Sequence, residues 1–410
     1  MSVPSAQTDR YVHDRLPPRE QWPEFRYDLP ELRIPDQANL VTVLFDAARA
    51  NGWSNRLLLR SPGQTLTYAE TEAQGARIAE MLIRDFKLEP GNRVLLRGGN
   101  SIGMALAWLA VVKAGLIVVP TMPLLRALEL GKVIDKAQPA LALCEVDLLE
   151  DMVLAAQDAR GRLPILAFGD SGRPDGLEQR ADDIALLAFT SGTTGVPKAV
   201  VTTHRDILAA CNTWPRHVLK MTPDDIVAGS PPLAFTFGTG GLLIYPMWAG
   251  ASVYYPDVRF SPETMVRKMR DNGITVCYTA PTFYRQMAPY AKALGIPSLR
   301  ICVSAGEALP DATRQLWKDA TGIEMLYGMG CTEMWHIYIS APGADVRPGT
   351  IGKVVPGYQA RVVDEHDQEV PRGTVGRLAV IGPTGCRYMD DARQTRYVAH
   401  GWNHPGDACI

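Results

Sequence analysis

Short apolar runs alternate with stretches of helical periodicity along the first half of the chain. A capping box at Thr67–Glu70 predicts the start of a helix that continues to about residue 86. Arg93–Leu96 predicts a strand, and Ser101 can cap a following helix over Ile102–Ala114. Leu116–Val119 then predicts a second buried strand. Strand, helix and strand in this order indicate a parallel sheet with a crossover connection.

The same alternation returns in the second half of the chain, without a repeat of fixed short period. Apolar segments of strand length are separated by segments of helical periodicity. This pattern predicts an α/β fold with two doubly wound α/β subdomains. The predicted strands are Ile226–Ala228, Ala251–Tyr255, Val276–Thr279 and Ile301–Ser304, and the predicted helices are Asp206–Thr213, Pro262–Asp271 and Ala312–Thr321.

The two ends of the chain have a different character. Residues 1–38 are rich in charge and proline, and we expect an extended N-terminal arm on the surface. After about residue 346 the predicted strands are short and separated by turns, as at Gln359–Val363 and Gly376–Ile381. We therefore expect the two α/β subdomains to occupy residues 39–345 and a small antiparallel β subdomain to occupy residues 346–410.

The composition narrows the classes of function. The 410 residues carry a net charge of −2 with no long block of one sign, so nothing favours binding to nucleic acid. Seven scattered cysteines without a Cys-x-x-Cys pair indicate neither a zinc ribbon nor a disulfide framework, and they fit a reducing cytosol. The longest apolar stretch, Ile102–Pro120, is interrupted by Lys113 and Gly115, and the N-terminus lacks a signal-peptide pattern. We therefore expect a cytoplasmic protein with no membrane partner.

One stretch carries the strongest chemical signal, and it follows the apolar strand predicted at Ile184–Phe189. Its glycine and hydroxylated residues end in Lys198, and a β-branched run, Val200–Thr203, comes next. Glycine lets the backbone approach a ligand, N–H and hydroxyl groups can donate to an anion, and the lysine adds a positive charge. A phosphate chain is the expected anion. The expected phosphate-binding residues are Thr190, Ser191, Gly192, Thr193, Thr194 and Gly195.

The spacing differs from that of the common phosphate loop, which has four residues between its glycines and a Gly-Lys-Ser/Thr ending. The string Phe189–Lys198 instead resembles the phosphate loop of the adenylate-forming superfamily, which includes acyl- and aryl-CoA ligases, luciferases and amino-acid adenylation domains. That family usually has glycine after the lysine, whereas this chain has Ala199. The resemblance implies ATP as a substrate and a catalytic role for Lys198.

Further motifs of the same family follow in the family's order. Tyr327–Glu333 resembles the motif of glycine, tyrosine, glycine, any residue, Thr-Glu, with Met329 at the position where the family's tyrosine packs on adenine. A thioether can also lie on a purine face. The resemblance implies that Thr332 bonds the α-phosphate and that Glu333 binds Mg²⁺, a hard cation that prefers oxygen ligands.

Two more motifs imply the rest of a nucleotide pocket. Ser304–Leu309 resembles the family's adenine-side loop, and Gly406-Asp407 resembles the Gly-Asp that holds the ribose hydroxyls. Trp108–Pro123 resembles an early motif of the family, to which we assign a structural role. The expected nucleotide-binding residues are Gly306, Glu307, Ala308, Tyr327, Gly328, Met329 and Asp407.

The segment Pro231–Gly238 bears on which acid is activated. Amino-acid adenylation domains have an aspartate here that holds the α-ammonium group, and this chain has Thr236, which disfavours an α-amino acid. Phe235 and Phe237 offer flat apolar walls. Cys331–Tyr338 resembles a Thr-Glu-Met-x-His-Ile run of benzoate-CoA and 2-aminobenzoate-CoA ligases, which implies a small aromatic acid. The expected substrate-binding residues are Phe235, Thr236, Phe237, Gly238, Ala305, Gly330, His336 and Ile337.

The implied reaction has two steps. The aryl carboxylate attacks the α-phosphorus of ATP to give an aryl-adenylate, and the thiol of coenzyme A then attacks the adenylate carbonyl. The alternatives are a medium-chain acyl-CoA ligase, an adenylating enzyme that loads an acyl carrier protein, and a non-catalytic nucleotide-binding module. Family members continue into a small C-terminal lid that carries the lysine for adenylation. This chain ends before it, and we expect a truncated form of a whole enzyme.

Overall fold

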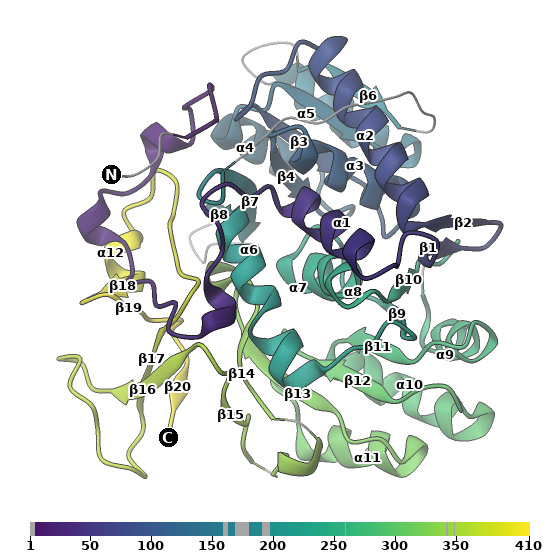
Figure 1. Cartoon of the computed structure of the whole chain (residues 1–410). Coiled ribbons are helices and arrows are strands. Elements are labelled where there is room, and N and C mark those ends of the chain that lie inside the picture. Colours follow the sequence, from purple (N-terminus) through teal and green to yellow (C-terminus); the bar gives the residue numbers. More distant parts are fainter. Residues whose placement is uncertain are drawn as a thin grey trace.

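The first sheet has six strands in the order β6-β5-β3-β4-β7-β8 (Figure 1). The computed structural model describes residues 5–158, 163–168, 180–190, 197–258, 260–341, 343–347 and 349–410. The strands run parallel from β6 to β7, whereas β8 pairs antiparallel with β7. The strands are β3 (Arg93–Arg97), β4 (Ile117–Thr121), β5 (Leu141–Cys144), β6 (Ile165–Ala167), β7 (Ile184–Thr190) and β8 (Lys198–Thr203).

Helices cover both faces of this sheet because successive strand residues point to opposite sides. Val118 of β4 packs in the same core as Trp108 of α3, whereas Ile117 and Val119 pack in a second core with Val133 of α4. All three β4 residues are fully buried. The helices around this sheet are α2 (Tyr68–Arg84), α3 (Ile102–Lys113), α4 (Ala127–Ala137) and α5 (Leu149–Asp158).

The second sheet has nine strands in the order β15-β14-β13-β12-β11-β9-β10-β1-β2. Its central strands are parallel, and antiparallel pairs close both edges. The strands are β1 (Leu57–Ser61), β2 (Gln64–Thr67), β9 (Ile226–Gly229), β10 (Ser252–Tyr254), β11 (Val276–Thr279), β12 (Ile301–Ser304), β13 (Leu326–Gly330), β14 (Ile337–Ser340) and β15 (Lys353–Val354).

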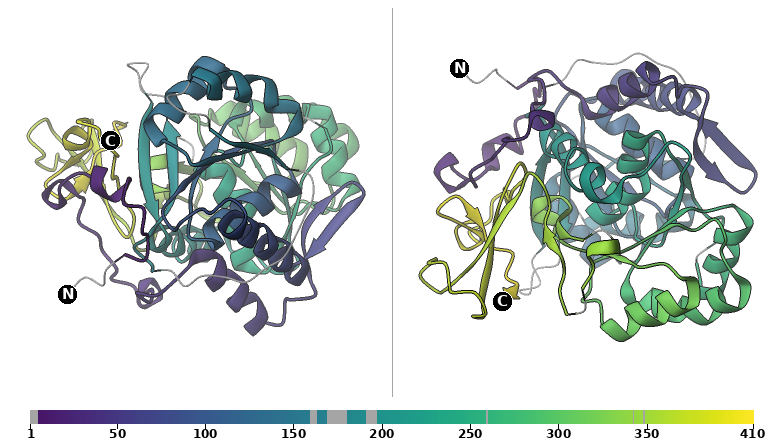
Figure 2. Two further views of the ribbon diagram at one scale, coloured as in Figure 1. Left: turned by 90° about the horizontal axis from the view of Figure 1, so that it is seen from above. Right: turned by 60° about the horizontal axis from the view of Figure 1, so that its bottom comes forward.

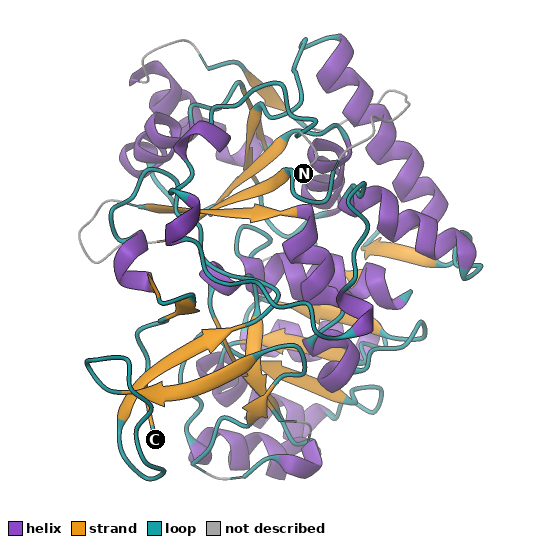
Figure 3. Cartoon of the chain, turned by 60° about the vertical axis from the view of Figure 1, so that its left-hand side comes forward, coloured by secondary structure: helices purple, strands orange, loops and turns teal. Residues whose placement is uncertain are grey.

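This second sheet is also covered on both faces (Figure 3). Cys277 of β11 packs in a core with Tyr284 and Trp317, whereas its neighbour Tyr278 packs in the large core shared with the first sheet. The helices are α1 (Leu40–Ala50), α6 (His204–Cys211), α7 (Thr236–Thr239), α8 (Tyr245–Ala249), α9 (Pro262–Asp271), α10 (Pro281–Leu294) and α11 (Asp311–Thr321), with π-helical turns η5 (Pro215–Leu219) and η6 (Gly240–Ile244).

A third, smaller sheet follows near the C-terminus and is antiparallel in all its pairings among the described residues. The N-terminal segment lies beside it, as the purple and yellow ribbons show in both views of Figure 2. Backbone N–H groups of Glu24 and Arg26 donate to the carbonyls of Gly401 and Gly382. The elements are β16 (Gln359–Val363), β17 (Gly376–Ile381), α12 (Gln394–Tyr397), β18 (Val398–Ala399), β19 (Trp402–Asn403) and β20 (Ala408–Cys409).

Short 3-10 turns connect several of these elements. Three of them lie in the N-terminal segment, which is not fully exposed: Val12 and Leu32 are each 1% exposed. Two isolated apolar residues among charges and prolines give no periodic signal, so their burial was not predicted. The turns are η1 (His13–Arg15), η2 (Arg19–Gln21), η3 (Pro30–Leu32), η4 (Val146–Leu148), η7 (Thr332–Met334) and η8 (Gly343–Asp345).

The predicted α/β fold class is confirmed, with small differences at element ends. Gly115, at a φ of 77°, follows the last turn of α3 in the left-handed conformation that ends many helices. Strand β4 continues through Pro120 to Thr121, although proline cannot donate to a ladder. Pro120 stands opposite Leu96 of β3, whereas the pairing of β4 with β7 involves only Val118. Strands β1 and β2 were not predicted.

The capping box at the start of α2 provides a test of this local structure. Thr67 Oγ1 accepts from Glu70 N at 3.2 Å, and Glu70 Oε2 accepts from Thr67 N at 2.8 Å. Thr67→Ala should reduce the free energy of unfolding by about 1 kcal/mol, the usual effect of losing such a cap. Thr67→Ser keeps the hydroxyl and should retain most of the stability. Urea denaturation of both variants checks this, and equal stability of Thr67→Ala and the parent would contradict it.

Candidate active site

A cavity of about 460 Å³ opens where the carboxyl ends of β12 and β13 meet. These neighbouring strands are parallel, so the loops that follow them lie at the same edge of the sheet. Asp407 reaches the cavity from the third sheet. All seven residues expected to bind the nucleotide line it together with Gly330: Gly306, Glu307, Ala308, Tyr327, Gly328, Met329 and Asp407.

Local contacts explain the residue types in this cavity. Tyr327 Oη donates to the backbone carbonyl of Glu307 at 3.1 Å, which ties the loop after β12 to β13. Gly306 has a φ of 86°, a backbone conformation that residues with a side chain rarely adopt. A Cβ at Gly328 would overlap the side chain of Ile337, and one at Gly330 would overlap the backbone of His336. The two glycines therefore allow β14 to lie close against β13.

Lys198, Glu333 and Tyr388 form a closed triangle of hydrogen bonds. Lys198 Nζ donates to Glu333 Oε1 and to Tyr388 Oη, both at 2.8 Å. Tyr388 Oη donates to the same Glu333 oxygen at 2.6 Å. Glu333 is 8% exposed and Tyr388 is 1% exposed. The structure thus brings together the predicted Lys198 and Glu333, and it adds Tyr388, which sequence analysis missed.

The loop itself is only partly described. Thr190, at the end of β7, pairs in register with Lys198, at the start of β8. The hydroxyl of Thr190 is buried and has no hydrogen-bond partner in the described part of the chain. Ser191, Gly192, Thr193, Thr194 and Gly195, predicted to bind phosphate, lie outside the described residues. Thr332, also predicted to act there, begins the turn η7 that carries Glu333.

His336 lies at the other end of this short segment, inside a cluster of aromatic rings. Its ring centroid is 4.7 Å from that of Tyr245, 5.4 Å from Trp214 and 5.7 Å from Phe237. A Cβ at Gly240 would meet the imidazole at 2.7 Å, so glycine is required on that side. Trp214 and Tyr245 were not predicted from the sequence, because nothing in their helices distinguishes them from ordinary core residues.

Several polar atoms of this cluster are buried without a hydrogen-bond partner of good geometry among the described residues. Neither ring nitrogen of His336 makes a hydrogen bond of good geometry to another described residue, and the same holds for Trp214 Nε1 and Tyr278 Oη. Burial lowers the pKa of His336 to about 3, and the nearby backbone carbonyl of Phe237 offsets only part of that effect. The imidazole is therefore neutral at physiological pH, with one N–H donor and one lone-pair acceptor.

The predicted substrate-binding residues differ in their burial and in whether they contact the aromatic cluster. Phe237 packs on both His336 and Tyr278. Thr236 and Gly238, which flank Phe237 in the sequence, are buried, and so is Ile337, which follows His336. Ala305, directly after β12, is also buried. Phe235 is 38% exposed, and among the described residues no ring contact joins it to the cluster. Its role in substrate binding stays a prediction.

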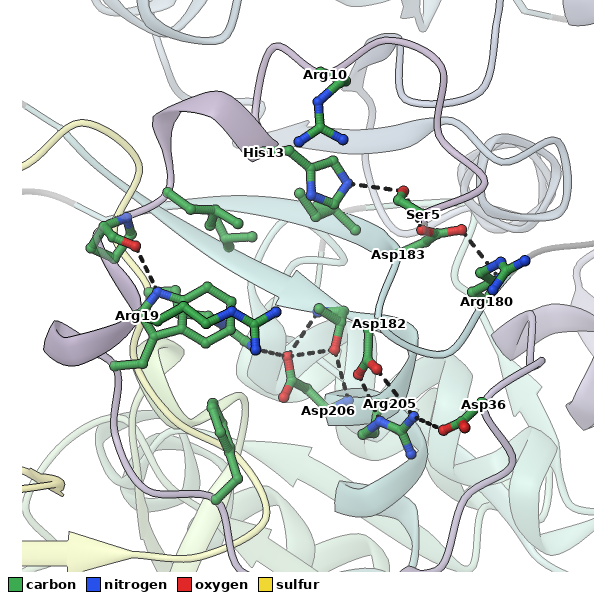
Figure 4. A pocket seen from close by; sticks show the side chains of 18 of the residues that line it. Ser5, Arg10, His13, Arg19, Asp36, Arg180, Asp182, Asp183, Arg205 and Asp206 are labelled. Carbon is green, nitrogen blue, oxygen red and sulfur yellow. Dashed lines mark hydrogen bonds and ion pairs between the residues drawn. The ribbon is translucent and has the colours of Figure 1, made fainter. Parts of the chain in front are cut away.

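A larger cavity, of about 730 Å³, lies between the N-terminal segment and the other end of β7 (Figure 4). Ile184, the first residue of β7, lines it, whereas the phosphate-type loop follows the last. Its aspartates are bound by neighbouring groups: Arg205 pairs with Asp36 and Asp182, and Arg387 pairs with Asp206. This cavity therefore lies where the N-terminal segment docks on the core, and it shares no lining residue with the smaller cavity.

Comparison with known proteins identifies the class to which this fold and site belong. Residues 46–387 match the family model described as AMP-binding enzyme, so the chain belongs to that family. This confirms the resemblance inferred from the phosphate-type loop and the later motifs. Among the described residues, no helix has the length and apolar character needed to cross a membrane.

The most similar relatives include two aryl-CoA ligases. The chain is 29% identical over 396 residues to benzoate–CoA ligase of Thauera aromatica, covering 92% of this chain and 75% of the relative. It is 30% identical over 386 residues to anthranilate–CoA ligase of Pseudomonas aeruginosa, covering 90% and 73%. Among solved structures, the anthranilate CoA ligase AuaEII in complex with anthranoyl-AMP matches with a TM-score of 0.85 at 27% identity, covering 93% of this chain and 76% of that one.

The buried, neutral state of His336 predicts a pH effect on stability. The unfolded chain protonates this histidine near pH 6.5, whereas the folded chain does so only near pH 3. The unfolded state therefore binds more protons between these values, and stability falls as the pH falls through this range. Above pH 6.5 the burial of neutral His336 does not reduce the free energy of unfolding. Below pH 6.5 the free energy of unfolding falls by about 1.4 kcal/mol per pH unit.

The variant His336→Phe keeps an aromatic ring and removes the titrating group. Relative to this variant, the parent should lose about 1.4 kcal/mol of unfolding free energy between pH 6 and pH 5. Between pH 7 and pH 8 the two proteins should show equal pH dependence, which is the internal control. Urea denaturation at each pH measures this, and parallel curves down to pH 5 would show that His336 accepts a proton in the folded state.

Proposed function

We propose that this chain activates a small aromatic carboxylate with ATP to an aryl-adenylate and then transfers the aroyl group to the thiol of coenzyme A, with release of AMP. The observation that carries the proposal is the segment Thr332–Ile337. At one end Glu333, three residues after Gly330 of the smaller cavity, contacts Lys198, and at the other end His336 enters the aromatic cluster. A carboxylate bound against the cluster would lie next to the phosphates of a bound nucleotide.

Residues of this chain can support the first chemical step. The acid's carboxylate attacks the α-phosphorus of ATP, pyrophosphate leaves, and negative charge accumulates on the phosphate oxygens. Lys198 and Thr332 are the groups that we assign to this charge, because donors fixed in place stabilise a transition state without reorganisation. Asp407, with two carboxylate acceptors at the far side of the cavity, would hold the ribose hydroxyls.

Magnesium is the cation that we assign to the nucleotide. Mg²⁺ is commonly held by one or two carboxylates together with substrate phosphates. Glu333 offers one buried carboxylate, and the part of the chain that the structure describes contains no cluster of three or more metal-ligating side chains. This donor set fits an ion held between Glu333 and phosphate oxygens, where it would neutralise phosphate charge.

The aromatic cluster supports an acid of one ring with a polar substituent. Flat rings from Trp214, Tyr245 and Phe237 surround His336 and favour a flat ligand. Buried polar atoms without partners are costly, and a substituent that bonds to them would recover that energy. Neutral His336 can donate to or accept from an ortho amino group, so 2-aminobenzoate is favoured over benzoate.

The first test concerns the nucleotide. Lys198→Ala and Glu333→Ala should each weaken binding of ATP·Mg by about 1.5–3 kcal/mol, because each removes a charge-assisted contact. Lys318→Ala, which removes a surface lysine of α11 that pairs with Glu324, is the matched control and should bind as the parent does. Isothermal titration calorimetry measures the affinities. Parent-like affinity in both site variants would remove the assignment of Lys198 and Glu333.

The second test concerns the acid. We expect the largest kcat/KM for 2-aminobenzoate or benzoate among a panel that also contains octanoate and phenylalanine. One methylene in an apolar pocket is worth only about 1–3 kcal/mol of discrimination, so ring-substituted analogues should be tolerated. Phenylalanine should fail because Thr236 cannot hold its ammonium group. A clear lead for octanoate would favour a medium-chain ligase, and equal values for the two aryl acids would remove only the amino preference.

A further inference from the structure

Tyr388 occupies a position between the two charges of the nucleotide site. Its hydroxyl accepts from Lys198 Nζ and donates to Glu333 Oε1. A tyrosine side chain carries one hydroxyl that can accept one hydrogen bond and donate another, as it does here. The lysine and the glutamate also contact each other directly at 2.8 Å. In this arrangement both groups that we assign to the nucleotide are already engaged.

The position of Tyr388 is fixed by its backbone and its ring. The segment that carries it pairs antiparallel with β8, where Val201 N donates to the Arg387 carbonyl and Met389 N donates to the Ala199 carbonyl. Tyr388 N donates to Gln394 Oε1 at 2.9 Å. The ring meets Tyr397 edge-on, with centroids 5.8 Å apart. The hydroxyl is therefore held in place by contacts that do not depend on Lys198 or Glu333.

Nucleotide binding must exchange these partners. If Lys198 turns to a phosphate, Glu333 loses its counter-charge and becomes a buried carboxylate beside a polyanion, which is strongly unfavourable. A cation that arrives with the phosphates replaces the lost charge. After this exchange, the hydroxyl of Tyr388 is the one protein group, among the described residues, that still bonds to Glu333. Groups that hold a metal-ligating carboxylate orient it toward the metal.

We propose that Tyr388 is a positioning residue which holds Glu333 in place when Lys198 leaves it for the nucleotide, and that this exchange makes nucleotide binding depend on a divalent cation. The inference rests on the proposed function, in which ATP binds at this site with Mg²⁺. It predicts a specific defect: without the Tyr388 hydroxyl, Glu333 is held in the empty site by Lys198 but is free to move in the loaded site. The variant should therefore lose affinity for ATP·Mg and keep its affinity for metal-free ATP.

The experiment is calorimetric titration with ATP, once in excess Mg²⁺ and once in EDTA. Its readout is the dissociation constant in EDTA divided by the dissociation constant in excess Mg²⁺. Tyr388→Phe keeps the ring and should reduce the ratio about tenfold, almost entirely through weaker binding of ATP·Mg. Glu333→Gln frees Lys198 from its ion pair, so it should abolish the Mg²⁺ dependence and also strengthen binding of metal-free ATP. The matched control is Tyr255→Phe, which removes a buried hydroxyl that donates to the Leu242 carbonyl and should retain the parent ratio.

The outcomes separate this inference from the proposed function. A parent protein that fails to bind ATP·Mg overturns both. A parent protein that binds ATP·Mg, with Tyr388→Phe showing the parent ratio, overturns the role of Tyr388 alone. If Glu333→Gln binds metal-free ATP no more tightly than the parent does, the exchange of partners is wrong. Because Glu333→Gln tests the same triangle from its other side, the exchange remains testable even if Tyr388→Phe folds poorly.

Discussion

One partly buried ion pair, together with the hydroxyl of Tyr388, joins the three parts of this structure. Lys198 begins β8 of the first sheet, Glu333 follows β13 of the second, and Tyr388 comes from the segment between β17 and α12. Removing one partner of a buried pair leaves an uncompensated charge, which is far more destabilising than the pair is stabilising. The arrangement therefore acts less as a source of stability than as a constraint on how the three parts can sit relative to one another.

The aromatic cluster is positioned by packing instead of charge. Gly240 and Gly330 leave no room for a side chain, so His336 and the start of β14 approach η6 and β13 as closely as backbone allows. Trp214 and Tyr245 then enclose the imidazole from two helical elements. Glu333 lies in η7 and His336 lies between η7 and β14, so a backbone shift of this short segment would move both the ion pair and the ring in the cluster.

Local chemistry allowed much of the fold to be predicted from the sequence. The capping box at Thr67, the left-handed Gly115 and the apolar runs of the parallel strands each depend on residues close in the chain. The motif residues that line the smaller cavity were predicted from their resemblance to a known family, which each short motif carries within a few consecutive residues. Tyr388 was missed because its contact with Lys198 joins residues 190 apart in the sequence. Such a contact depends on the register of an antiparallel pairing that no local pattern encodes.

The departure at Ala199 can now be understood in physical terms. The residue after Lys198 is fully buried, and its methyl group belongs to the core on one face of the first sheet, together with Met389. Its carbonyl accepts from Met389 N, the residue that follows Tyr388. A side chain at this position therefore packs beneath the segment that supplies the tyrosine, where glycine would leave space, and it helps to hold that segment against β8.

The two ends of the segment Thr332–Ile337 are in opposite states before any ligand arrives. At Glu333 every charge has a partner, so binding of a nucleotide must first break contacts within the protein. At His336 the buried nitrogens lack partners of good geometry among the described residues, so a polar ring substituent would add contacts without breaking any. For the proposed reaction, a nucleotide is therefore selected by its ability to replace the existing contacts of Glu333. An acid is selected by its ability to form hydrogen bonds with the buried nitrogens of His336.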